Sequence, residues 1–186
     1  TGDGQTISEV FLVDLPNDVT RSGPDGPLQG TLTTRPNPPA GVRQRRLTYT
    51  AERKYPGLQG PRHWLRSSPD GTRIAFLMKD DAGVAQFWTV SPNGGPPRQV
   101  TRNRWDVASA FSWSPDGQRL AYVMDNSVFI TDVTTGDGER LTQRTDDATA
   151  PTHHACVFSP DGGRIAFMRP MCIDGESHDQ IIVVEL

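Results

Sequence analysis

The sequence predicts an all-β fold built from repeated four-stranded antiparallel sheets. A Ser-Pro-Asp-Gly motif occurs three times, with its prolines at positions 69, 115 and 160, which are 46 and 45 residues apart. Short runs of β-branched and aromatic residues flank each motif, and this composition is typical of strands. The chain of 186 residues also has 18 Gly and 16 Pro, which interrupt the longer stretches and leave little helical periodicity.

Each Ser-Pro-Asp-Gly motif predicts a hairpin turn. Glycine tolerates the positive φ of such a turn, aspartate hydrogen-bonds to its own backbone, and the preceding proline restricts φ at the turn entry. We therefore expect turns at Asp70-Gly71, Asp116-Gly117 and Asp161-Gly162. The three aspartates are assigned to these turns and not to catalysis.

One period of the repeat holds four expected strands in a fixed order. Strand A precedes the turn, strand B follows it, strand C is a run rich in Val, Ile and Phe, and strand D ends in Leu-Thr or Val-Thr. Strand C recurs near Val10, Gln86, Ser127 and Gln180, and strand D ends at Thr48, Thr101 and Thr142. Four antiparallel strands in about 40–45 residues form a β-propeller blade. The sequence thus predicts about three to four blades of an incomplete propeller ring.

The strand order divides this single partial propeller domain, residues 1–186, into four parts. They are a C–D pair at 9–50 with a long proline-rich loop at 16–42, blades at 60–103 and 107–144, and an incomplete blade at 151–186. Strand 180–186 is a strand C with no strand D after it, so we expect it to have an open edge. Propellers have about four to eight blades. We expect the rest of the ring to come from a longer native chain or a second copy.

Alternation along the strands predicts which side chains pack between blades. Successive side chains of a strand point to opposite faces. On strand A, one column therefore holds Leu65, Phe111 and Cys156, and a second column on the same face holds Ser67, Trp113 and Phe158. The side chains expected to be largely buried are Phe76, Phe111, Trp113, Tyr122, Phe158 and Phe167.

These repeats resemble those of TolB-type propellers, whose signature runs Ser-Pro-Asp-Gly, a short strand and later Arg-x-Leu-Thr. The stretches at 42–50, 55–58, 61–64 and 74–83 resemble more closely the YidR-like family of bacterial propellers. Pro-Arg-His-Trp at 61–64 and Lys-Asp-Asp-Ala-Gly at 79–83 separate this family from generic TolB repeats. The resemblance extends from about Glu9 onward and looks like the C-terminal half of such a protein. It implies a propeller and no established reaction.

Charge and composition exclude several classes of function. The chain has 19 basic and 22 acidic residues, a net charge of −3, and this gives no large positive field for nucleic acid. No apolar run approaches the roughly 20 residues of a transmembrane helix. Cys156 and Cys172 do not resemble a disulfide framework. A nucleophile elbow, a phosphate loop and a CxxC motif are all missing from the sequence, so we assign no catalytic residue.

Candidate site residues gather in the loops before strand A. In propellers the D–A and B–C loops share one end of the blades, called here the channel-mouth face, and strand A starts there beside the central channel. His63, Trp105, Asp106, His153 and His154 all lie near this face. These five residues are therefore the candidates for a polar ligand site at the channel mouth.

Three interpretations of these residues remain open. The protein is either a binding scaffold for a protein or carbohydrate, or a metal-dependent carbohydrate-active enzyme similar to oligogalacturonate lyase. In the enzyme, His63 and His154 are the candidate ligands of a divalent metal, the one cofactor considered. In the third interpretation the histidines only satisfy backbone groups between blades. The sequence favours this structural role, and it favours binding over catalysis. A metal site is disfavoured because adjacent residues such as His153 and His154 face opposite ways on a strand.

Overall fold

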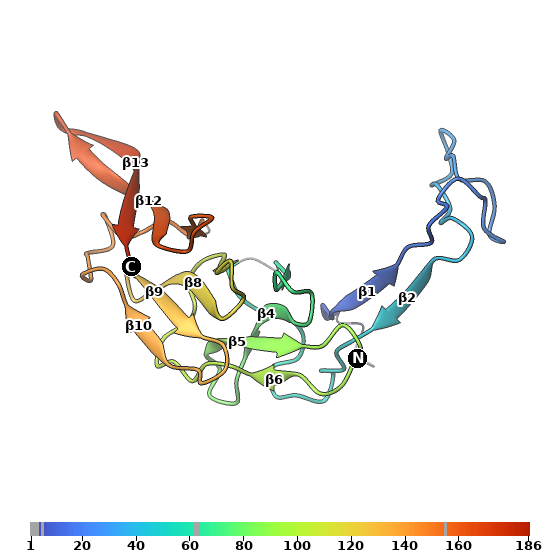
Figure 1. Ribbon diagram of the computed structural model, residues 1–186, viewed down its shortest axis with the longest axis horizontal. Coiled ribbons are helices and arrows are strands. Elements are labelled where there is room, and N and C mark those ends of the chain that lie inside the picture. Colours follow the sequence, from blue (N-terminus) through green and yellow to red (C-terminus); the bar gives the residue numbers. More distant parts are fainter. Residues whose placement is uncertain (1–3, 5, 62–63, 155) are drawn as a thin grey trace.

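The computed structural model describes residues 4, 6–61, 64–154 and 156–186, which form thirteen β-strands and no helix. The strands make four antiparallel sheets of two, four, four and three strands. The sheets follow one another in chain order along an open arc (Figure 1). This arrangement confirms the predicted all-β propeller fold with an incomplete ring. Within the described residues there is no helix that could cross a membrane.

Each sheet contains the strands in the expected order. The first sheet pairs β1 (Phe11–Asp14) with β2 (Arg43–Arg46). The second contains β3 (Arg66–Ser67), β4 (Ile74–Lys79), β5 (Ala85–Val90) and β6 (Arg98–Gln99). The third contains β7 (Ser112–Trp113), β8 (Arg119–Met124), β9 (Ser127–Asp132) and β10 (Gly138–Arg140). The fourth contains β11 (Val157–Phe158), β12 (Arg164–Ile173) and β13 (Glu176–Glu185). The residue bounds assigned to the blades from the sequence stay a prediction.

The Ser-Pro-Asp-Gly turns are held by the motif's own side chains. Ser68 Oγ donates to Asp70 Oδ1 at 2.5 Å and accepts the Arg73 N–H at 3.0 Å, while Thr72 N–H donates to the same carboxylate. Gly71 takes φ 70°, the left-handed conformation that glycine adopts without strain. The same hydrogen bonds recur in the turns at Asp116 and Asp161. Serine is therefore as much a part of the turn as Asp-Gly.

The threonine of each Leu-Thr or Val-Thr motif fastens strand D to strand C. Thr101 Oγ1 accepts the Phe87 N–H at 2.9 Å, and Val100 N–H donates to Phe87 O at 2.8 Å. Thr48 and Leu47 hold Val10 in the same way, and Thr142 and Leu141 hold Val128. The pair thus satisfies both backbone groups of one strand C residue just after the regular ladder ends.

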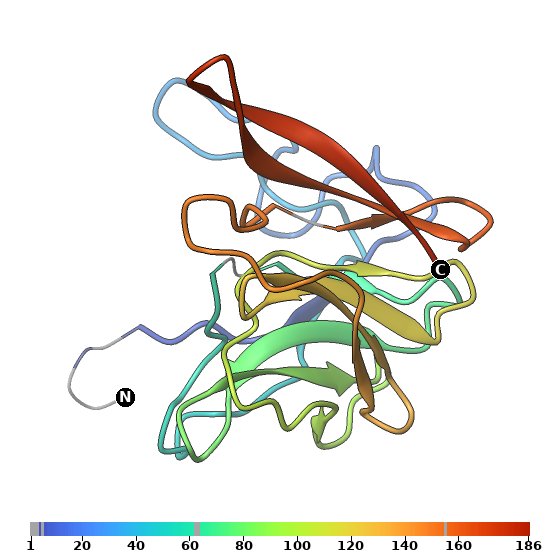
Figure 2. The same ribbon diagram turned by 90° about the vertical axis from the view of Figure 1, so that its left-hand side faces the viewer.

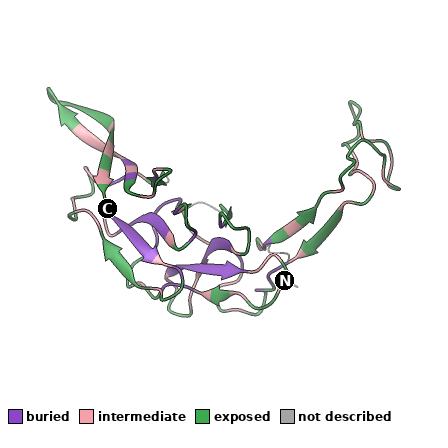
Figure 3. Ribbon diagram, in the orientation of Figure 1, coloured by how far each residue is buried: buried purple, intermediate pink, exposed green. Residues whose placement is uncertain are grey.

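Apolar side chains fill the spaces between consecutive sheets, and Figure 3 shows burial concentrated in the middle of the arc. Ile74, Phe76 and Met78 of β4 pack toward the first sheet, whereas Ala75 and Leu77 pack toward the third. Between the second and third sheets, the Phe87 ring lies edge-on to Phe111 and to Tyr122, each with ring centroids 4.8 Å apart. Both faces of a middle sheet are therefore core.

Five of the six predicted core aromatics are buried, namely Phe76, Phe111, Tyr122, Phe158 and Phe167. The prediction was wrong for Trp113, which is only partly buried. Its indole Nε1 donates to Arg66 O of the preceding sheet at 2.9 Å. Leu65 shares a column with buried Phe111 and Cys156 but is 39% exposed. Among the described residues, the sheet before it has no strand A or B to cover Leu65. Burial raises the pKa of the Cys156 thiol to about 12.

The segment 15–42 and the β12–β13 hairpin both extend beyond the packed sheets, and β13 forms a sheet edge. The segment 15–42 between β1 and β2 extends away from the sheets and closes on itself through a bridge between Ser22 and Pro39. The β12–β13 hairpin has ten residues in each strand and projects beyond the other blades (Figure 2). As expected, β13 is an edge strand, with β12 as its neighbour in the sheet. Side chains on one face of this sheet, including Ile181 and Val183, are exposed.

Replacing Thr101 by valine should lower the free energy of unfolding by about 1–3 kcal/mol, because the buried Phe87 N–H and Gln86 Oε1 would lose their shared hydroxyl partner. Chemical denaturation of the full chain measures the loss. Thr101→Ser keeps the hydroxyl and serves as the matched variant, which should lose less. Equal losses for the two variants would show that the methyl group, rather than the hydroxyl, stabilises this position.

The Ser68 hydroxyl and the Thr72 backbone hold the pKa of Asp70 at about 2, below the ordinary 3.8. Because this pKa is lowered in the folded state, the contribution to stability is complete above about pH 4 and is lost as the pH falls through about 2. Ser68→Ala should raise the Asp70 pKa, as measured by NMR titration of the carboxyl carbon. The stability difference between wild type and Ser68→Ala should shrink over the same pH range. An unchanged Asp70 pKa would contradict the hydroxyl's role.

Candidate functional site

A cavity of about 510 Å³ lies at the channel-mouth face between the second and third sheets, and we call it the Asp106 cavity. Its polar lining side chains include Lys79 at the end of β4, Asp106 in the loop between β6 and β7, and His153 in the loop between β10 and β11. The D–A loop segments 59–61 and 107–108 complete most of the wall. The cavity therefore draws on loops of three consecutive blades.

Asp106 is positioned by the first residue of β5. Its Oδ1 accepts the Ala85 N–H at 2.7 Å, and the following residue, Val107, donates its N–H to Ala85 O at 3.1 Å. Val107 is fully buried and anchors the D–A loop in the core between the two sheets. The carboxylate is thus held at the cavity wall by a backbone group, and its other oxygen, Oδ2, adds further acceptor capacity.

His153 connects the third and fourth sheets to the same cavity. Its Nδ1 lies 2.5 Å from Ala108 O, and its own carbonyl accepts the Ala110 N–H at 3.1 Å. A carbonyl oxygen only accepts, so Nδ1 is the protonated nitrogen of this contact. In the neutral ring, Nε2 is then an acceptor. The His153 ring thus holds Ala108 O through Nδ1 and has Nε2 as a second nitrogen that could bind another partner.

Cationic side chains gather beside Lys79. The Nζ atoms of Lys54 and Lys79 lie 5.2 and 5.6 Å from the centroid of the Tyr55 ring. Arg53 donates to Lys79 O at 2.9 Å and stacks over Trp88, with 4.6 Å from Cζ to the ring centroid. Lys79 itself is the cationic residue of the Asp106 cavity's lining, and its charge is opposite in sign to that of the Asp106 carboxylate.

A second cavity of about 470 Å³, the His154 cavity, adjoins the first, and His153 lines both. Asn126, Asp147, Thr152 and His154 are among its polar lining residues. Asn126 Nδ2 donates to Asp147 Oδ1 at 2.7 Å, and His154 Nδ1 lies 3.0 Å from Thr152 Oγ1. Its polar groups are largely engaged with one another.

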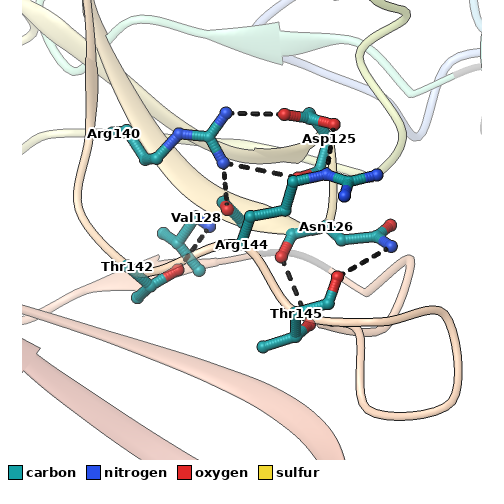
Figure 4. A network of polar contacts seen from close by, with 8 residues as sticks. Asp125, Asn126, Val128, Arg140, Thr142, Arg144 and Thr145 are labelled. Carbon is teal, nitrogen blue, oxygen red and sulfur yellow. Dashed lines mark hydrogen bonds and ion pairs between the residues drawn. The ribbon is translucent and has the colours of Figure 1, made fainter.

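An ion-pair network fixes the loop that forms one wall of the His154 cavity (Figure 4). Asp125, in the turn between β8 and β9, accepts hydrogen bonds from Arg140 at 2.6 Å and from Arg144 at 2.8 Å. Asp125 and Asn126 both have positive φ, 47° and 52°, the two left-handed residues of a tight hairpin turn. The Arg140 hydrogen bond is the main reason that the pKa of Asp125 is lowered.

The structure brings together some of the residues singled out from the sequence. Asp106 and His153 line one cavity, and His154 lines the adjoining one. Trp105 is 44% exposed and stacks with Arg104, and neither cavity includes it. His63 lies outside the described residues. Their functional roles stay predictions.

No group of three or more His, Cys, Asp or Glu in the described part of the chain is placed to hold a metal. Because His63 is not described, the candidate pair of His63 and His154 stays a prediction. Lys79 was not among the residues singled out as site residues. Its position as the last residue of strand B, whose end lies at the channel-mouth face, is the signal that could have identified it.

Comparisons with known proteins agree with this fold. The family described as the dipeptidyl peptidase IV (DPP IV) N-terminal region matches residues 96–170. The uncharacterised protein YidR of Escherichia coli K12 is 49% identical over 168 residues, which are 89% of this chain and 40% of YidR. The chain therefore spans about two fifths of the length of this relative.

Two solved structures show the same fold. Oligogalacturonate lyase of Vibrio parahaemolyticus superposes with a TM-score of 0.57 at 13% identity, covering 96% of this chain and 44% of the lyase. A TolB structure from Agrobacterium tumefaciens superposes with a TM-score of 0.53 at 22% identity, covering 95% of this chain and 61% of the TolB chain. At these identities the likeness concerns the fold alone.

The His153 contact predicts a specific tautomer. With Nδ1–H donating to Ala108 O, NMR of ring nitrogens in the neutral form should show Nδ1 protonated and Nε2 unprotonated. Replacing His153 by phenylalanine should lower the free energy of unfolding by about 1 kcal/mol, since Ala108 O loses its partner. His154→Phe is the comparison variant. Finding the Nε2–H tautomer at His153 would contradict the contact.

Proposed function

Because this chain is a YidR-like, TolB-type propeller sequence, we propose that it is a ligand-binding scaffold whose site is the Asp106 cavity. The observation that carries the proposal is the meeting of Lys79, Asp106 and His153, from three blades, in one cavity at the channel-mouth face. Ligand sites are concave, with a few converging polar groups on a rigid scaffold. Here Lys79 ends strand β4, and hydrogen bonds to backbone groups hold Asp106 and His153 in their loops.

The chemistry of the cavity suits a small hydroxylated acid, such as a uronic acid of a carbohydrate. Lys79, with Lys54 beside it, supplies positive charge for a carboxylate. Asp106 retains Oδ2 as an acceptor for sugar hydroxyls, and His153 retains Nε2 as another. A neutral sugar would use the acceptors without the charge, so it should bind more weakly than an acidic one.

The alternative of a metal-dependent carbohydrate-active enzyme rests on the channel-mouth histidines, with His63 and His154 as the candidate metal ligands, and His63 lies outside the described residues. The fold likeness to oligogalacturonate lyase does not carry that activity to this chain. Binding without catalysis is therefore the function we propose. Nucleic acid is not among the expected ligands, given the net charge of −3.

Calorimetric titration of the full chain with trigalacturonate tests the proposal, with uncharged maltotriose as the comparison ligand. Lys79→Met should weaken trigalacturonate binding about tenfold or more, because it removes a charge-assisted contact. Asp106→Asn keeps an oxygen for Ala85 N–H and should weaken binding severalfold without unfolding the loop. Arg35→Met, in the projecting segment, is the matched control for lost charge and should bind like wild type. If trigalacturonate does not saturate, or if Lys79→Met and Asp106→Asn bind it like wild type, the acidic-carbohydrate site is wrong.

A further inference from the structure

Another cavity lies between the second and third sheets, away from the Asp106 cavity. It measures about 360 Å³ and lies next to the outer strands β6 and β10, on the convex side of the arc (Figure 1), and we call it the Arg102 cavity. The described residues that line it differ from those of the Asp106 cavity. Cavities of about 300 Å³ or more can hold a small ligand. The same pair of sheets thus holds two separate cavities, one at the channel-mouth face and one at the outer wall.

Backbone contacts fix both walls of the Arg102 cavity. On the side of the second sheet, Asn103 donates its N–H to Gln86 Oε1 at 2.9 Å, and its carbonyl accepts from Gln86 Nε2 at 2.9 Å. On the side of the third sheet, the turn at Gly136 lies so close to the second sheet that a Cβ on this residue would overlap Val100 O. The cavity is therefore formed by the way in which two consecutive sheets pack.

The buried part of the cavity lining is apolar. Val100, Met124 and Phe129 line the cavity, and all three are buried. Gly138, the first residue of β10, lines it as well, and its φ is not positive, so the backbone does not require glycine there. A Cβ at Gly138 would meet Thr131 Oγ1 at 3.3 Å. Glycine in a strand often marks a place where another group approaches closely. The missing side chain of Gly138 thus keeps the cavity open beside its apolar lining.

The exposed part of the lining carries two charges of opposite sign. Arg102 follows β6 of the second sheet, and Asp137 precedes β10 of the third. The backbone of Asp137 is held, because its N–H donates to Thr135 Oγ1 at 3.1 Å and its carbonyl accepts the Asp132 N–H at 2.9 Å. Among the described residues, however, neither the Arg102 guanidinium nor the Asp137 carboxylate has a hydrogen-bond or ion-pair partner. One cavity thus holds a cation and an anion that do not neutralise each other.

We propose that the Arg102 cavity binds a free α-amino acid with an apolar side chain, such as leucine. An α-amino acid carries a carboxylate, an ammonium group and a side chain on one carbon atom, and the lining offers a partner for each of the three. Arg102 binds the carboxylate, Asp137 binds the ammonium group, and the side chain enters beside Met124 and Phe129. A ligand with a single charge would leave one of the two protein charges without a partner. An acidic sugar would also bring its carboxylate close to Asp137.

NMR titration of the isotope-labelled full chain with L-leucine tests the proposal, and saturable shifts are expected at the amides of Asn103, Gly136 and Gly138. Leucinamide lacks the carboxylate and N-acetyl-leucine lacks the ammonium group, so each should bind at least about fivefold more weakly than leucine. Free glycine keeps both charges but has no apolar side chain to bury, and it should also bind more weakly. The absence of saturable shifts, or an analogue that binds as tightly as leucine, would overturn the proposal.

Substitutions in the protein test the two charged contacts separately. Arg102→Met should weaken leucine binding about fivefold but leave the binding of leucinamide, which has no carboxylate, unchanged. Asp137→Asn should likewise weaken leucine binding and leave N-acetyl-leucine unaffected. Glu139→Gln, on β10 but outside the lining of the Arg102 cavity, is the matched control and should bind leucine like wild type.

The variants also separate this proposal from the one for the Asp106 cavity. Arg102 and Asp137 do not line the Asp106 cavity, so trigalacturonate binding should respond to neither substitution. Both side chains are exposed, and circular dichroism and thermal unfolding should therefore match wild type. If a folded Arg102→Met or Asp137→Asn variant binds leucine like wild type, the amino-acid site is wrong, whatever the result with trigalacturonate.

Discussion

The packing of each sheet between two neighbours is the interaction on which the rest of this structure depends. In β4, large side chains such as Phe76 pack toward the preceding sheet and the small Ala75 packs toward the following one. The same alternation places Tyr122 and Ala121 on opposite faces of β8. A large residue of one blade thus meets a small residue of the blade before it, as Tyr122 and Ala75 do in the core between the second and third sheets. An end sheet has one such face uncovered.

This packing also places the candidate site. Backbone hydrogen bonds tie the loops at the channel-mouth face to a strand, as in Val107 to Ala85, or to the loop of the next blade, as in Ala110 to His153. Because these bonds join each loop to a strand or to a loop of the next blade, the distances among Lys79, Asp106 and His153 follow from the arrangement of the blades. The site is therefore a property of consecutive blades together.

Small polar side chains complete the backbone hydrogen bonding that short strands leave unfinished. Strands A and D have only two or three residues each in the four-stranded sheets. Threonine at the end of strand D and serine at the turn each use a hydroxyl both as donor and as acceptor. A hydroxyl suits this task because it can bond an N–H and a carbonyl or carboxylate at once. The repeated motifs mark these fastening points rather than reactive groups.

The sequence by itself determined the all-β repeat, the strand order and most of the core. Those features depend on local turn chemistry at Asp70-Gly71 and its counterparts and on the period-two alternation that buries Phe76 and Tyr122. Only the tertiary structure decided that Asp106 and His153 share a cavity with Lys79 while Trp105 stays outside it. It likewise decided that Leu65 is exposed whereas Phe111 in the same column is buried. The physical reason is that these outcomes depend on which neighbouring blade covers a residue, and a repeat pattern specifies one blade at a time.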